Sequence, residues 1–139
     1  MHSRELALKF AALTLIIAAV VYVPLAHARL VRNTIDETAT VIDDGQSVVL
    51  TGPIECSQEQ WVDMRVTVTQ RSTGAVAEGH ALILGTKTEQ QWEIVADLQG
   101  DATFKKGEAT AVALATSMKK NGQVDDAHQW LVNMTLVQE

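Results

Sequence analysis

The chain has 139 residues, of which 47% are hydrophobic and 20% are charged, and its formal net charge is −6. An acidic balance argues against nucleic acid or an anionic membrane as the partner. The single cysteine excludes a disulfide within the chain, so the core must supply the stability that a bridge would add, typically about 2–4 kcal/mol.

The first 28 residues have the three parts of a secretory signal. A short positive start with Arg4 and Lys9 precedes an apolar run, Phe10–Val23, and a small-residue triplet that ends at Ala28. We expect a signal-peptide helix that is removed by cleavage after Ala28, which makes the mature protein secreted or extracytoplasmic. The alternative is an uncleaved N-terminal membrane anchor, because the apolar stretch is near the short end of what spans a bilayer.

Residues 29–139 suit one domain and are too few for two. They carry 9 basic and 16 acidic side chains, a net charge of about −7, and these charges are scattered along the chain. We expect residues 29–37, which are mixed and polar, to form a loose lead-in segment. The domain itself is predicted to span residues 38–139.

Short alternating runs separated by turn residues dominate the domain. Thr38–Ile42 is the first predicted strand, and the Asp44-Gly45 step after it is a strong hairpin signal. Ser47–Thr51 is the second, with Gly52-Pro53 expected to end it. In Trp61–Gln70 every second residue is apolar, which predicts a strand with one buried and one wet face.

A turn at residues 71–74 leads to a hairpin partner at Ala75–Leu84, in which Gly79 suggests a bulge. Gln91–Leu98 and Gln129–Val137 alternate in the same way. Ala109–Ser117 also fits a helix, but its flanking glycines and its place among strands favour a strand. About seven strands in roughly 100 residues predict an all-β fold, an immunoglobulin-like antiparallel β-sandwich, and the same pattern also allows a small barrel.

Parts of three strands resemble small secreted actinobacterial-type proteins of immunoglobulin-like fold and unassigned function: Leu50–Cys56, Val66–Gln70 and Gln91-Trp92. The resemblance covers about Thr40–Val137. It implies a disulfide between a cysteine at position 56 and a partner near residues 84–86. This chain has Leu84, Gly85 and Thr86 there, so that bridge is not expected, and the resemblance assigns no functional residue.

No residue pattern in the mature chain indicates catalysis or cofactor binding. A nucleophilic site needs a nucleophile, a base and an orienting group, and neither Cys56 nor any serine lies in a nucleophile elbow. The group Asp125, Asp126 and His128 has donor atoms for a surface calcium ion but lacks the spacing of a calcium loop. We therefore expect no enzyme activity, no metal and no cofactor.

Two residues stand out as candidates for interaction. Trp92 and Trp130 lie in phase with apolar neighbours and are expected in the core, whereas Trp61 is out of phase with Val62 and is expected at the strand edge or on the outer face. Exposed aromatic rings stack on sugar faces, so Trp61 is the candidate binding residue among the three tryptophans. Cys56 is expected to be a buried, inert thiol, with an intermolecular disulfide as the alternative.

These observations predict an exported, non-enzymatic binding or structural module whose partner is an extracellular protein or glycan. The alternative is a small extracellular protease inhibitor or enzyme with a site on a loop such as Cys56–Gln60. A homodimer linked through Cys56 is a third hypothesis.

Overall fold

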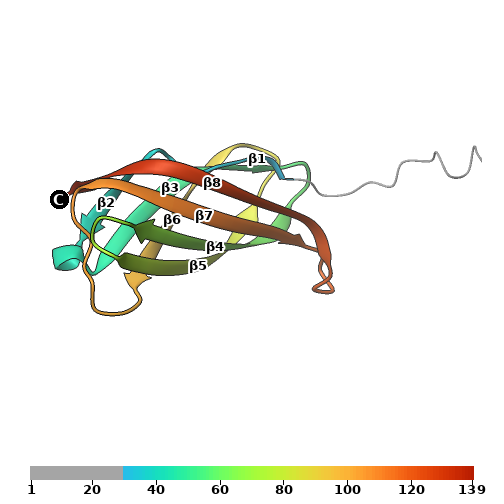
Figure 1. Cartoon of the computed structure of the whole chain (residues 1–139). Helices are drawn as coiled ribbons and strands as arrows, with labels where there is room; N and C mark the ends of the chain where they lie inside the picture. Colours follow the sequence, from blue (N-terminus) through green and yellow to red (C-terminus); the bar gives the residue numbers. More distant parts are fainter. Residues whose placement is uncertain (1–29) are drawn as a thin grey trace, which may run out of the picture.

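The computed structural model describes residues 30–139, and almost all regular structure in them is β-strand (Figure 1). The expected all-β class is confirmed. The predicted signal peptide and its cleavage site lie outside the described residues. None of the described residues belongs to a helix that is long and apolar enough to span a membrane. The strands are β1 (Leu30–Asn33), β2 (Thr38–Ile42), β3 (Ser47–Cys56), β4 (Gln60–Gln70), β5 (Ala75–Gly85), β6 (Gln90–Leu98), β7 (Gly107–Met118) and β8 (Val124–Gln138).

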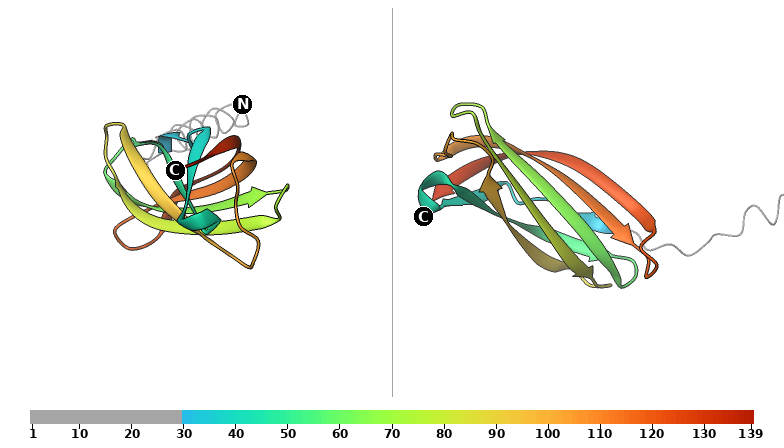
Figure 2. Two further views of the ribbon diagram at one scale, coloured as in Figure 1. Left: turned by 90° about the vertical axis from the view of Figure 1, so that its left-hand side faces the viewer. Right: turned by 90° about the horizontal axis from the view of Figure 1, so that it is seen from below.

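The strands form one sheet that closes on itself. The order is β2-β8-β7-β4-β5-β6-β3, and β3 pairs with β2 again, so seven strands complete a barrel; β1 adds to the end of β3. The view along the barrel in Figure 2 shows this closure. All pairings are antiparallel except that of β2 with β8. Of the two architectures that the sequence left open, the hydrogen-bonded connectivity is that of the barrel rather than of two clearly separate sheets.

Two pairings between neighbouring strands of the barrel, which we call its seams, are short. β2 pairs with β3 only over Thr40–Ile42, and β5 pairs with β6 only at Ala77 and Glu78. The bulge expected at Gly79 is absent, because the register of β5 with β4 runs through this residue without a shift. Gly79 instead lies so close to β6 that a Cβ there would collide with Ile94. The glycine is needed where the two strands cross.

Three segments differ from the expected ones by more than two residues. β1 lies in the predicted lead-in, where Leu30 is buried and pairs with Cys56. β3 continues through Gly52-Pro53: the Pro53 carbonyl accepts a hydrogen bond from Thr34 N, so the missing N–H of Pro53 points toward the end of β1 and interrupts no ladder. β8 begins at Val124, so the acidic segment before the predicted last strand is part of the strand.

The barrel interior is filled by alternate residues of every strand. From β4 the buried side chains are Val62, Met64, Val66 and Val68, and the neighbouring strand β7 contributes the small side chains of Ala109, Ala111, Ala113 and Ala115. Alternating large and small residues is how a small barrel fills its interior without a channel. Phe104, from the segment between β6 and β7, is 1% exposed and joins this core.

The buried side chain of Gln70 binds the segment between β6 and β7 to the barrel through hydrogen bonds. Gln70 is 0% exposed. Its Nε2 donates to the Lys105 carbonyl at 2.7 Å, and its Oε1 accepts from Lys105 N at 2.9 Å and from Thr73 Oγ1 at 3.0 Å. Both ends of the amide are therefore satisfied, as a buried polar group requires, and Gln70 joins the β4–β5 turn to the loop that carries Phe104.

Candidate functional site

The outer face of β5, β4, β7 and β8 carries a row of apolar side chains. Trp61 of β4 stands opposite Leu84 of β5 on one side and Met118 of β7 on the other, and Met118 stands opposite Val124 of β8. Directly opposite residues have Cβ atoms about 5 Å apart, so these four side chains form a continuous line across the sheet. We call Leu84, Trp61, Met118 and Val124 the apolar row.

The apolar row is open to solvent. Trp61 is 48% exposed, Leu84 39% and Val124 62%, and Leu82, the next outward residue of β5, is 55% exposed. Trp61 was expected at the strand edge or on the outer face, and it lies on the outer face. Trp92 is buried and Trp130 partly buried against the core, also as predicted.

A polar cluster borders the apolar row. The Asp63 carboxylate contacts His80 Nε2 and lies 3.9 Å from Arg65 Nε. Asp63 stands opposite Leu82, and Arg65 stands opposite His80. Exposed ion pairs of this kind contribute little to stability. They do give the apolar row a hydrogen-bonding border on the side toward the middle of the sheet.

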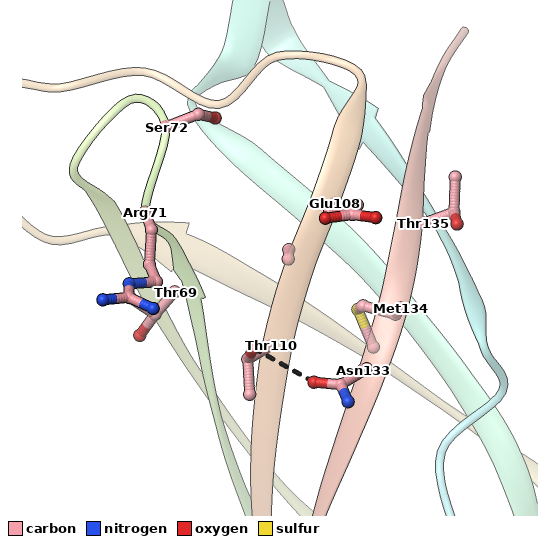
Figure 3. A pocket seen from close by; sticks show the side chains of 9 residues that line it. Thr69, Arg71, Ser72, Glu108, Thr110, Asn133, Met134 and Thr135 are labelled. Carbon is pink, nitrogen blue, oxygen red and sulfur yellow. Dashed lines mark hydrogen bonds between the residues drawn. The ribbon is translucent and has the colours of Figure 1, made fainter.

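A polar groove lies at the other end of the same face (Figure 3). It has a volume of about 740 Å³, and Arg71 and Glu108 are the charged residues that line it. Thr110 Oγ1 donates to Asn133 Oδ1 at 3.5 Å across β7 and β8. The remaining polar lining residues are hydroxyl-bearing: Thr69, Ser72, Thr110 and Thr135. This groove offers hydrogen-bonding groups but is wide open to solvent, so it is a weaker candidate than the apolar row.

The acidic residues considered for calcium bind other parts of the protein. Asp125 Oδ2 accepts from Gln60 Nε2, and Asp126 Oδ2 accepts from the main-chain N–H of Leu30, each at 3.1 Å. Among residues 30–139, no group of three or more His, Cys, Asp or Glu side chains is placed to hold a metal ion. These carboxylates join β8 to β4 and β1.

A loop-borne catalytic site would pair Cys56 with one of the two histidines of the domain, His80 or His128, as its base. His80 lies on β5, whereas His128 on β8 lies 3.5 Å from Asp126, the carboxylate whose charge also acts on Cys56. The burial of the Cys56 sulfur is what separates this group from a substrate. Cys56 is 1% exposed at the end of β3. That burial also puts its sulfur out of reach of a second chain.

The environment of Cys56 keeps its thiol protonated. Burial raises the pKa of Cys56 above its ordinary value, and the negative charges of Asp126 and Glu55 raise it further. The thiolate is the nucleophilic form of cysteine. The Cys56 thiol therefore lacks both the access and the charge state of a reactive cysteine.

We expect Cys56 to resist a thiol-specific maleimide in the native protein and to react fully in denaturant.

The raised pKa of Cys56 also sets the direction in which stability changes with pH. As pH rises above about 8.5, the unfolded chain loses its thiol proton before the folded chain does, so the free energy of unfolding falls. Urea titrations at pH 7.5 and pH 10 measure this decrease. The decrease should be smaller in Cys56→Ala. An equal decrease in both proteins would contradict the raised pKa of Cys56.

A scan against protein-family models finds no match, and a search of the curated proteins finds no relative. Function is therefore inferred from the surface itself. Leu82, Leu84, Met118 and Val124 were not singled out in the sequence. The signal that unites them with Trp61 is the strand register, which places residues from four separate segments side by side.

Proposed function

We propose that this domain is an exported, non-enzymatic binding module that holds an extracellular protein partner against the apolar row. The observation that carries the proposal is the exposure of Trp61, 48%, in line with three other apolar side chains. Single exposed apolar residues are ordinary on protein surfaces, whereas contiguous groups with a polar border mark interaction sites. Tryptophan is also among the residues that contribute most to binding energy at interfaces.

The surroundings of Trp61 favour a protein over a glycan as the partner. Leu84 and Met118 flank the indole on both sides within the row. A sugar bound on the ring would need hydrogen-bonding groups beside it, and the nearest ones, Asp63 and Arg65, contact each other or His80. An apolar centre with a charged border is the usual composition of a protein–protein interface. A glycan remains the second candidate.

The export of the module and its immunoglobulin-like kinship are parts of the same proposal. Export is supported by the signal features of residues 1–28. The kinship is supported by strand pairing: β3 pairs with β6, while β4, β7 and β8 are neighbours, as strands B and E and strands C, F and G are in immunoglobulin domains. The short seams at β2–β3 and β5–β6 would then be the corners where two sheets meet.

The test is a capture experiment with the protein secreted by an expression host and immobilised at its C-terminus. Trp61→Ala should weaken retention of the captured extracellular protein at least tenfold, because truncating a central aromatic residue costs about 2 kcal/mol or more. The unfolding midpoint should change little, since Trp61 is about half exposed. Retained protein is quantified by mass spectrometry against a concentration series.

The matched control is Leu131→Ala, which truncates an exposed leucine of β8 that lies outside the apolar row. It should retain the partner as well as the unchanged protein does. Equal retention by Trp61→Ala and the unchanged protein would refute the proposal. A glycan array in parallel decides between the two partner classes.

A further inference from the structure

One stretch of β5 is an unpaired sheet edge. β5 pairs with β4 from Ala75 to Gly85, but its pairing with β6 ends at Glu78. From His80 to Leu84, therefore, the strand has β4 as its only ladder partner within the described chain, and on the other side a single side-chain hydrogen bond reaches it, from Gln90 Nε2 to the Leu84 carbonyl. In Figure 1, β5 accordingly forms the border of the layer that also contains β4, β7 and β8.

The main-chain groups on this edge point away from β4. The Val76 carbonyl accepts from Gln99 N at 2.7 Å, and the Leu84 carbonyl accepts from the Gln90 side chain at 2.6 Å. Both partners lie on the side opposite β4. Because alternate residues of a strand direct their N–H and C=O groups to the same side, His80 and Leu82 present theirs on this side too. Each is exposed.

The edge lacks the features that normally prevent an edge strand from pairing with a strand of another molecule. Residues 80–85 contain no Lys, Arg, Asp, Glu or Pro, and the register with β4 shows no bulge. Leu82, at the centre, is 55% exposed. Proteins normally block such edges with charge, proline or a bulge, because an uncharged exposed edge is a template for another strand.

We propose that this edge pairs with the same edge of a second copy, antiparallel and with Leu82 on the two-fold axis. A two-fold contact uses one patch on both copies, so the patch must be compatible with itself. About this axis Leu82 faces Leu82 of the second copy, and His80 faces Leu84 of the second copy. The exposed Gln90 side chain leaves the Leu84 carbonyl when the His80 N–H of the second copy takes its place. The layer of β2, β8, β7, β4 and β5 then continues into the same layer of the other copy.

The charges near the edge allow this contact. Asp63, the nearest carboxylate on β4, contacts His80 and lies near Arg65 in its own copy. Two copies of Asp63 would be three strand spacings apart, about 14 Å. This exceeds the screening length of about 8 Å at physiological salt, so the repulsion between the two carboxylates is weak.

The inference goes beyond the proposed function, because it rests on the main-chain groups of β5 and not on Trp61. A short edge contact is smaller than the standard interface of about 800 Å² per partner. We therefore expect reversible association with a dissociation constant in the micromolar range.

Sedimentation velocity of the secreted protein, from about 1 to 200 µM, tests the proposal. The unchanged protein should shift from monomer to dimer over this range. Leu82→Lys should raise the dissociation constant about tenfold or more, because it places two like charges directly opposite each other across the axis. The matched control Leu131→Lys adds the same charge to a leucine of β8 with a similar exposed fraction, 62% against 55% for Leu82, and should dimerise normally.

A monomer throughout the range would overturn the inference, and so would equal effects of Leu82→Lys and Leu131→Lys. Trp61→Ala separates the two proposals, since it should lose the captured partner and still dimerise. Dimerisation without capture would refute the proposed function alone, and capture by a strict monomer would refute the edge contact alone.

Discussion

Gly85→Cys is expected to form a disulfide with Cys56 and to raise the free energy of unfolding by about 3–4 kcal/mol, the value for a closed loop of about 30 residues. A Cβ built on Gly85 lies 3.3 Å from Cys56 Cβ, close to the spacing of about 3.5–4.5 Å found in disulfides. Gly85 is not among the glycines with positive φ, so its backbone accepts a side chain.

Two measurements check this expectation. Thiol titration of the denatured, non-reduced variant should find no free thiol, and urea unfolding with and without reductant should show the gain only in the oxidised form. Gly85→Ala is the control: its Cβ would collide with Cys56 Sγ without the possibility of a bond, and a loss of about 1–3 kcal/mol is expected. Two free thiols in Gly85→Cys would show that positions 56 and 85 do not meet as described.

Gln70→Leu is expected to lower the free energy of unfolding by about 3 kcal/mol. Leucine fills a similar volume but leaves the N–H and C=O of Lys105 without the amide that now binds both of them. The substitution removes three hydrogen bonds of the Gln70 amide, two to Lys105 and one to Thr73, each of which contributes about 0.5–1.5 kcal/mol. Because Lys105 follows Phe104, the loop should also detach from the barrel more often.

Urea unfolding measures the stability, and amide hydrogen exchange measures the loop. In Gln70→Leu, exchange should accelerate at Lys105 N and at Phe104 N, which donates to the Gly45 carbonyl. Gln99→Leu changes an exposed glutamine in the same region and should alter stability by less than about 0.5 kcal/mol. Similar stabilities for the two variants would contradict the role assigned to Gln70.

The strands that the sequence predicted best are those whose pattern is local. Alternation in Trp61–Gln70 marks the buried face of β4 without reference to any other segment. The strand expected at Ala109–Ser117 was also confirmed, in spite of its helix-compatible alanines, because these side chains fit the narrow interior of a closed barrel. The outward position of Trp61 followed from its phase relative to Val62.

Features that depend on distant pairing were not predictable. β3 passes Gly52-Pro53 because β6 continues alongside it as far as Gln90, which residues 47–56 alone do not reveal. β1 forms because the end of β3 offers it an edge. The apolar row and the open edge of β5 depend on register and on where a seam stops, and both are set by the whole fold. Gln70, similarly, looks like an ordinary surface glutamine in the sequence.

The parallel pairing of β2 with β8 has a consequence for when the protein can fold. It joins Thr38, near the beginning of the domain, to Thr135, near its end. Contacts of such high sequence separation form slowly, because the intervening chain must be ordered before they are gained. During synthesis, the barrel cannot close until β8 has emerged. The polypeptide therefore stays unfinished for as long as β8 is held back, and an unfinished chain is the state that the proposed export would use.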